Sequence, residues 1–266
     1  MSIDLSYQET WMHKANPSLK LVLFLILMVT LLFIHRLDYL IYFTVFPLAL
    51  LFLFTGHPIK RVLLFSIPFV LLFISTSTSM IFFGKGDTTW FHWGLVHITE
   101  ESFYRGIHLG FRALNYAIIG LVFALTTRPV NLFYSLMQQM KLAPRYAYSF
   151  MAAVRLLPIA FEEFQTLRYA YKVRGVQHEK GLKGMYEKLK FYAIPLLAQS
   201  IRRAQRIALA MEAKQFTNGR RTHYYRIGFS RHDLTLVLCV MMSILSAYLF
   251  SQYLPYTGVE DVRYYD

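Results

Sequence analysis

The chain has 266 residues, 56% of them hydrophobic and 17% aromatic, with a mean hydropathy of +0.38 and a net charge of +13. Only 16% of the residues are charged, against about 25% in ordinary soluble domains, so the chain has too little polar surface for a water-soluble globule. The composition therefore predicts an integral membrane protein. Because there is a single cysteine, Cys239, an intrachain disulfide and a cysteine metal site are excluded.

The N-terminal stretch WMHKANPSLK, residues 11–20, is short and amphipathic. Pro17 suits the first position of a helix, and Asn16 before it suits the N-cap. Five strongly apolar runs, each predicted to span the membrane, follow this start: residues 21–34, 37–54, 62–83, 107–127 and 234–254. The first run has only 14 residues, and its flanks are needed to extend it toward the ~20 residues that a helical span requires.

The positive charge is concentrated in residues 128–231, which hold 19 Lys or Arg and 5 Glu, a local net charge of +14 that leaves −1 for the remainder. Such a basic block can bind nucleic acid, contact an anionic lipid surface or form a cytoplasmic domain beside membrane spans. Next to the apolar runs the cytoplasmic domain is favoured, and no nucleic-acid partner is expected.

The connections between the runs predict the orientation of the chain. Basic residues before the first run and at 60–61 fall on the same side as the 128–231 block, whereas the loop 84–105 and the tail after residue 254 carry net negative charge. By the positive-inside rule the N-terminus and the block are cytoplasmic and the C-terminus is outside. The predicted organisation is a membrane domain with four spans at 1–127, a cytoplasmic domain at 128–231, a last span at 232–254 and an external tail at 255–266.

The basic block is predicted to contain a short helix at 130–140, lying along the membrane surface, and two long amphipathic helices. Apolar residues recur every three or four positions over residues 150–171 and again over residues 189–211. Pro158 and Pro195 are expected to start or kink these two helices.

Each of the two helices ends near a basic residue. Arg174 precedes Gly175, a natural C-terminal cap, and the second helix carries Lys214 and is expected to close at Asn218–Gly219. A basic residue in a last turn can simply complement the helix dipole, which contributes ~0.3–1 kcal/mol. Two helices of one design that both end in this way favour instead a docking role toward a soluble partner.

Ala204 and Ala208 are small and lie one turn apart on the second helix. Because small residues let helices approach closely, the two helices are predicted to cross there, with both tips facing the cytoplasm. The expected fold class is an all-α integral membrane protein with about five transmembrane helices, a short interfacial helix and a cytoplasmic domain of two long crossed amphipathic helices.

Two polar constellations leave alternatives open. Arg112, inside the fourth run beside His108 and Asn115, is either a functional intramembrane charge or a side chain that snorkels to the outer interface, and the second interpretation is preferred. Glu162-Glu163 followed by Arg168 is one residue off the Glu-Glu-x-x-x-Arg pattern of intramembrane prenyl-protein proteases, without their paired histidines. Since no nucleotide-binding or metalloprotease motif occurs either, the chain is not expected to be an enzyme or to hold a metal.

Three segments carry a resemblance to a known family: HKANPSLKLVL, VRLLPIAFEEFQTLRYAYKVRGV and IPLLAQSIRRAQRIALAMEAKQF. They resemble the opening and the two coupling helices of the transmembrane T component of energy-coupling factor (ECF) transporters, which includes the cobalt-transport CbiQ-like proteins. The resemblance covers most of the chain, and the paired helices are its specific part.

The resemblance implies a non-catalytic subunit of an importer in the prokaryotic plasma membrane. It implies two ABC-type ATPase subunits as partners, which would bind ATP and magnesium, so that this chain needs no cofactor of its own. It also implies a small membrane substrate-capture component (S component) in the same lipid bilayer. Movement of the ATPases would pass through the coupling helices to that component, for uptake of a vitamin, a vitamin precursor or a metal ion.

Carried over by position, the implied ATPase-docking residues are Val173, Arg174 and Gly175 on the first helix and Ala213, Lys214 and Gln215 on the second. The family pattern is Ala-Arg-Gly, so Val173 is a mild departure. Lys214-Gln215 keeps the charge but loses the bidentate bonding of arginine and the helix-ending glycine. The second tip is therefore expected to grip more weakly, or its helix to run on to Asn218–Gly219.

Two other functions stay open from the residues alone. One is another membrane permease or adaptor whose basic block binds a different soluble partner or anionic lipid, and the other is an intramembrane enzyme. The sequence does not name the transported substrate.

Overall fold

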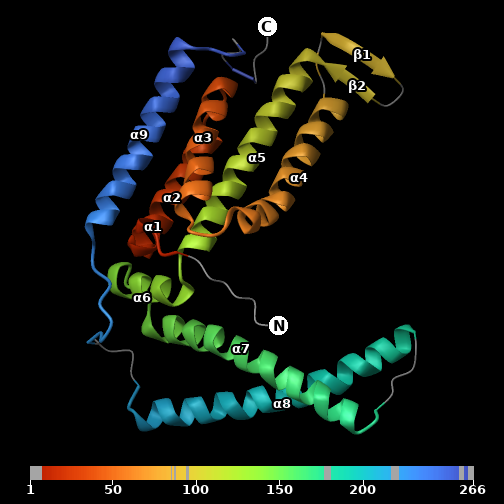
Figure 1. Ribbon diagram of the computed structural model, residues 1–266, viewed down its shortest axis with the longest axis vertical. Helices are drawn as coiled ribbons and strands as arrows, with labels where there is room; N and C mark the ends of the chain where they lie inside the picture. Colours follow the sequence, from red (N-terminus) through yellow and green to blue (C-terminus); the bar gives the residue numbers. More distant parts are fainter. Residues whose placement is uncertain are drawn as a thin grey trace. The chain divides into compact units, whose positions relative to one another are not determined.

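The computed structural model describes residues 8–84, 86, 88–93, 96–176, 181–216, 222–257 and 261–262. Within these residues the chain forms nine helices and one antiparallel hairpin (Figure 1), which confirms the predicted all-α class. The elements are α1 (Trp11–Lys14), α2 (Pro17–Leu32), α3 (Leu37–Phe54), α4 (Ile59–Phe83), β1 (Thr89–Trp93), β2 (Val96–Thr99), α5 (Glu100–Thr126), α6 (Pro129–Gln139), α7 (Pro144–Val173), α8 (Leu182–Ala213) and α9 (Arg231–Tyr253). They fall into two compact units, unit 1 (Met1–Leu132 with Ile227–Asp266) and unit 2 (Phe133–Arg226).

Unit 1 is a bundle of apolar helices. Four of them, α3, α4, α5 and α9, have between 18 and 27 residues and are long and apolar enough to cross a membrane. Helix α2 is also apolar but has 16 residues, which at 1.5 Å per residue reach about 24 Å of a hydrocarbon core that is ~30 Å thick. Four of the five predicted spans are thus confirmed in length, and the first is shorter than a full span.

Local capping determines where helices of unit 1 begin. Asn16 accepts a hydrogen bond from the Ser18 amide at 3.1 Å, and Pro17 occupies the first turn of α2, as predicted. Thr99 caps α5 by accepting from the Ser102 amide at 3.2 Å. Helix α5 therefore starts well before its apolar run, because its polar first turn belongs to the helix but not to the hydrophobic stretch.

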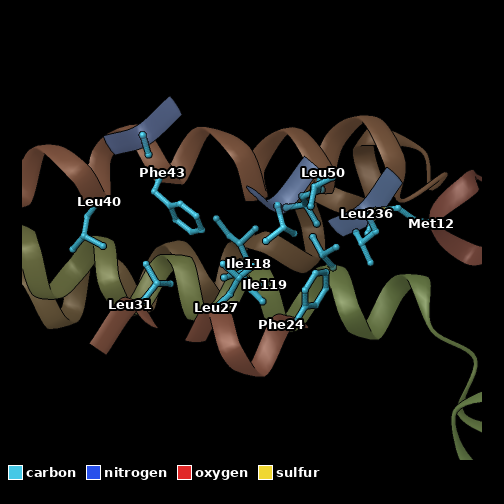
Figure 2. Packing of buried hydrophobic residues seen from close by; sticks show 14 of the residues in the cluster. Met12, Phe24, Leu27, Leu31, Leu40, Phe43, Leu50, Ile118, Ile119 and Leu236 are labelled. Atoms are coloured by element: carbon cyan, nitrogen blue, oxygen red, sulfur yellow. The ribbon is translucent and has the colours of Figure 1, made fainter. Parts of the chain in front are cut away.

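The core of unit 1 lies where α2, α3, α5 and α9 meet, and α1 closes one end of it. Figure 2 shows side chains from these five helices interdigitating: Met12, Phe24, Leu27, Leu31, Leu40, Phe43, Leu50, Ile118, Ile119 and Leu236. Each of them is at most 4% exposed. In a bilayer such contacts stabilise the bundle through close packing, since lipid tails are as apolar as the side chains themselves.

Helix α4 joins the bundle through glycines of α5. Only Val62 and Ser77 of α4 are buried, and most of its other large apolar side chains are exposed. A Cβ atom on Gly106 would lie 2.6 Å from Ile81 Cγ1, and Ser77 Oγ donates to the Gly106 carbonyl oxygen at 2.8 Å. The missing side chain at Gly106 is what lets the two backbones approach.

Polar side chains inside unit 1 bind backbone carbonyls and one another. Arg112 donates from Nη2 to the Ile34 carbonyl oxygen at 2.6 Å, and His108 Nε2 lies 3.2 Å from the same oxygen. Asn115 Nδ2 donates to Thr44 Oγ1 at 2.9 Å. Because Ile34 follows the end of α2, Arg112 stabilises the connection between α2 and α3.

Unit 2 contains the end of α6 and the two longest helices of the described chain. Helix α7 has 30 residues and α8 has 32, which correspond to about 45 and 48 Å. Pro158 and Pro195 lie inside these helices, so the alternative in which the prolines start them is wrong. A proline inside a helix removes one main-chain hydrogen bond, but both helices continue past it. Pro144 occupies the first turn of α7 instead of Pro158.

We expect Gly106→Leu to lower the free energy of unfolding by roughly 1–3 kcal/mol, because the added side chain overpacks the contact between α4 and α5. Gly120→Leu on the same helix is the matched control, since a Cβ atom there meets nothing within 4 Å. Heat-induced exposure of the single thiol of Cys239 to a thiol-reactive dye in detergent measures both variants. Equal unfolding temperatures would contradict the glycine packing.

Candidate functional site

Helix α7 ends in a tightly bonded turn. Arg174 is the C-cap, and Gly175 after it has a φ of +67°. The Gly175 amide donates to the Lys172 carbonyl oxygen at 3.2 Å, and the Val176 amide donates to the Tyr171 carbonyl oxygen at 3.2 Å. This pair of bonds is the Schellman motif, in which a left-handed residue ends the helix. The helix thus ends where the sequence predicts.

Helix α8 ends in the same turn, although it has no glycine there. Gln215 has a φ of +52°. Its amide donates to the Glu212 carbonyl oxygen at 2.8 Å, and the Phe216 amide donates to the Met211 carbonyl oxygen at 3.0 Å. Both hydrogen bonds of the Schellman motif are therefore present at each tip.

The second tip differs from the sequence expectation in position. Helix α8 stops at Ala213 with Lys214 as its C-cap, so the expectation that it runs on to Asn218–Gly219 is wrong; these two residues lie outside the described part of the chain. A left-handed conformation costs a residue with a Cβ atom roughly 1–2 kcal/mol. The two turn hydrogen bonds and the packing of Phe216 offset this cost at Gln215.

Each tip is joined to the other long helix by an aromatic contact. Phe216, after the α8 tip, lies edge-on to Tyr148 of α7 with 5.7 Å between the ring centroids. Near the α7 tip, Tyr171 lies edge-on to Phe191 of α8 with 4.9 Å between the ring centroids, and its hydroxyl donates to the Phe191 carbonyl oxygen at 3.2 Å. Val176 lines a groove of about 590 Å³ beside them. Each tip is therefore held by both helices.

The two long helices run in opposite directions and cross, so their tips lie at opposite ends of unit 2 (Figure 1). Glu163 of α7 forms an ion pair with Arg203 of α8 and accepts from Gln199 Nε2 at 3.5 Å. Phe164 and Tyr192 meet with 5.3 Å between ring centroids. This ion pair is not predicted from the sequence, where Glu163 belongs to the weak protease-like pattern; in the structure its carboxylate pairs with Arg203.

Ala204 and Ala208, which the sequence predicts at the crossing, are both exposed. The groove between the helices is lined instead by residues of α8 that precede them, Pro195 and Leu196 among them, facing Ala170 of α7. The described contacts between α7 and α8 thus concentrate on the N-terminal side of the two alanines.

Both tips present an exposed cation. Arg174 and Lys214 are exposed, and within the residues that the structure describes neither has an ion-pair partner. Val173 beside Arg174 is 88% exposed. A cation at a helix C-terminus lies at the negative end of the helix dipole, which stabilises the helix end. The arrangement is suited to binding carboxylates or helix-end carbonyls of a partner.

The same region offers no ligand set for a metal. Across the described ranges of the chain, no three His, Cys, Asp or Glu side chains gather as metal ligands would.

Comparison with known proteins covers both units. The family model CbiQ, described as cobalt transport protein, matches residues 8–225, a range that includes both helix tips. Three relatives are each named energy-coupling factor transporter transmembrane protein EcfT. The Brevibacillus brevis protein is 30% identical over 253 residues, which are 89% of this chain and 93% of the relative.

The other two relatives align over similar lengths. The Ruminiclostridium cellulolyticum protein is 28% identical over 254 residues, covering 90% of this chain and 94% of the relative. The Staphylococcus aureus protein is 26% identical over 267 residues, covering 94% and 95%. Since the family model matches most of the sequence and these relatives align over nearly all of it, the chain belongs to the CbiQ family of cobalt transport proteins.

Proposed function

We propose that this chain is the transmembrane coupling component of an energy-coupling factor transporter. It is a non-catalytic subunit that transmits ATP-driven motion from two ABC-type ATPase subunits to a membrane substrate-capture component. The observation that carries the proposal is the pair of crossed helices whose exposed cationic tips end in the same bonded turn. Relatives that bear the name of this component support it.

The tip of α7 supplies the stronger docking contact. The guanidinium of Arg174 has five N–H donors in a planar fork, which suits carboxylates or helix-end carbonyls in a groove of an ATPase. The Schellman turn fixes the backbone of Val173, Arg174 and Gly175 before the partner arrives, so less conformational entropy is lost on docking. The exposed side chain of Val173 adds apolar contact beside the charge.

The tip of α8 supplies a weaker contact through Ala213, Lys214 and Gln215. The ammonium of Lys214 is a point charge and cannot form the planar two-bond contact of arginine. Gln215 nevertheless keeps the left-handed turn that glycine makes at the other tip. The two tips that bind the ATPases therefore have the same backbone turn, but the tip with Lys214 binds more weakly than the tip with Arg174.

Movement at one tip travels along a continuous helix to the crossing. Neither α7 nor α8 is broken between its start and its tip. At the crossing the Glu163–Arg203 ion pair, whose side chains are only 19% and 24% exposed, and the contact of Phe164 with Tyr192 join the helices. Exposed apolar side chains on α7, such as Leu157, offer the capture component a surface to which this motion is delivered.

Nucleotide chemistry belongs to the partners in this proposal. ATP and magnesium bind the ATPase subunits, this chain carries no cofactor, and the lipid bilayer rather than nucleic acid surrounds unit 1. The capture component selects the substrate, which is a vitamin, a vitamin precursor or a metal ion.

The proposed topology places the N-terminus and residues 128–231 in the cytoplasm of a prokaryotic cell, with four spans before them, the last span at 232–254 and the tail 255–266 outside. The local charge of residues 128–231 supports this orientation. Thr257, near the start of the tail, lies at the start of α3, where its amide donates to Asp38 Oδ1 at 2.9 Å, whereas α1 lies at the other end of unit 1 (Figure 1).

We expect Arg174→Glu to abolish recovery of the ATPases with the tagged chain, and Lys214→Glu to reduce it less. Truncating one partner of a buried charge pair costs about 2–5 kcal/mol, and a reversed charge adds repulsion. A mild-detergent pull-down from native membranes with mass spectrometry measures both. Lys60→Glu, which reverses an exposed cation of unit 1, is the control and is expected to retain the ATPases.

The same pull-down tests the function itself. Recovery of one or two ABC ATPases and a small hydrophobic membrane protein with the wild-type chain is the expected result, and the small protein identifies the substrate class. A wild-type complex that is intact by size but contains no ATPase would turn the assignment to an adaptor with another partner. ATPase recovery unchanged in both reversal variants would remove the docking role of the tips.

We expect Gln215→Gly to stabilise the end of α8 by roughly 1 kcal/mol, because glycine adopts a positive φ without the steric cost that a Cβ atom brings. Slower hydrogen exchange of a peptide covering residues 211–216 reports the gain. Gln215→Ala is the control, since alanine keeps the Cβ atom and should give no protection. Equal exchange in the two variants would show that the left-handed turn does not limit this tip.

The orientation is tested with two introduced cysteines in a Cys239→Ser background. Tyr224 is 92% exposed in the basic block and Tyr256 is 84% exposed in the tail. A membrane-impermeant maleimide should label Tyr256→Cys in intact cells, and Tyr224→Cys only after the membrane is permeabilised. The reverse pattern would invert the proposed topology.

A further inference from the structure

Lys20, near the start of α2, is only 1% exposed, which is unusual because a buried ammonium is costly unless its donors are bonded. Its Nζ donates to the Met12 carbonyl oxygen at 2.6 Å, the Thr126 carbonyl oxygen at 3.2 Å and Thr126 Oγ1 at 3.3 Å. Thr126 is the last residue of α5. The ammonium therefore satisfies an end carbonyl of α5 at the negative end of its dipole.

Asp233, in the first turn of α9, is the acidic member of the same buried cluster and is 4% exposed. Its Oδ2 accepts from the Ser230 amide at 2.6 Å, and its Oδ1 accepts from the Asn16 amide at 2.5 Å. Asn16 also donates from Nδ2 to the Gly228 carbonyl oxygen at 3.3 Å. Lys20 thus ties α2 to the end of α5, and Asp233 with Asn16 ties α2 to the start of α9.

All of these residues belong to unit 1, and they lie at the two places where the chain passes to unit 2. The chain leaves unit 1 shortly after Thr126 and returns to it at Ile227, just before Ser230. Any pull that unit 2 exerts through the chain therefore acts first on the helix ends that this cluster holds.

Hydrogen bonds to buried charges resist such a pull better than apolar contacts do. Within a bilayer, apolar side chains gain little by leaving lipid for one another, so helices that share only such contacts can shift along each other. A buried charged group that loses its partner carries a large cost, and its bonds are directional. The cluster of Asn16, Lys20 and Asp233 consequently fixes three helix ends in one register.

We propose that Asn16, Lys20 and Asp233 form a buried clamp that makes α2, α5 and α9 follow the movement of unit 2 as one body. These are positioning residues for coupling, and the inference rests on the proposed function of the chain as a transporter component. Without the clamp, α5 and α9 would each follow their own connection, and α2 would receive motion only through apolar packing.

The test compares hydrogen exchange with ATP and with ADP in the full chain bound to its co-purified ATPases in lipid nanodiscs. In the wild-type complex we expect peptides covering residues 12–20, 120–127 and 228–236 to change exchange together when ATP replaces ADP. In Lys20→Met the ATPases should stay bound and hydrolyse ATP, while the ATP-dependent difference in residues 12–20 is lost. A merely structural role would raise exchange equally with both nucleotides and leave that difference in place.

Two further variants keep the test decisive. Lys14→Met removes an exposed lysine of α1 and should behave as the wild type. Asp233→Asn has one side-chain oxygen in place of two, so it cannot accept from the Ser230 and Asn16 amides together, and it should lose only the ATP-dependent difference in residues 228–236. This milder variant carries the test if Lys20→Met does not fold.

The two possible failures are distinguishable. A folded Lys20→Met or Asp233→Asn complex that keeps the full ATP-dependent difference overturns the clamp while the proposed function stands. Absence of ATPases from the wild-type sample overturns the proposed function, and the coupling role of the clamp with it.

Discussion

Backbone groups at helix ends need partners that the helix itself does not supply, and this need determines where the chain is held and where it is free to bind. In unit 1 the ends of α2, α5 and α9 are satisfied by the buried side chains of Asn16, Lys20 and Asp233. In unit 2 the ends of α7 and α8 are satisfied by main-chain turns, which leave the side chains of Arg174 and Lys214 exposed. The need to satisfy helix-end backbone groups thus fixes three helix ends together in unit 1 and leaves two cations exposed at the helix tips of unit 2.

Local sequence features predicted most of the fold. Apolar runs located the membrane-length helices, and Asn16 with Pro17 marked the start of α2, because capping and hydropathy depend on neighbouring residues. The start of α5 at Thr99 was missed because the first turn of that helix is polar. The starts of α7 and α8 were also missed, since Pro158 and Pro195 suggested helix starts but lie inside long helices.

The candidate site was predictable only where its geometry is local. Arg174 followed by Gly175 predicts a helix end from neighbouring residues alone. Gln215 adopts a left-handed conformation that is supported by the contact of Phe216 with Tyr148 on the other helix. Lys20 was counted as one more basic residue beside a span. Its burial depends on Thr126, which is 106 residues away, and no charge count distinguishes such a lysine from one at the interface.

The cross-packing of the two tips ties the length of one helix to that of the other. Tyr171 contacts Phe191 of α8 and Phe216 contacts Tyr148 of α7, so each tip has one rotational position. A single residue inserted between the crossing and a tip would turn that tip by about 100° and advance it by about 1.5 Å, which detaches the anchoring side chain from its partner. Unit 2 can therefore accept exchanges of residues on its exposed faces, whereas an insertion or deletion within its long helices would misplace a tip.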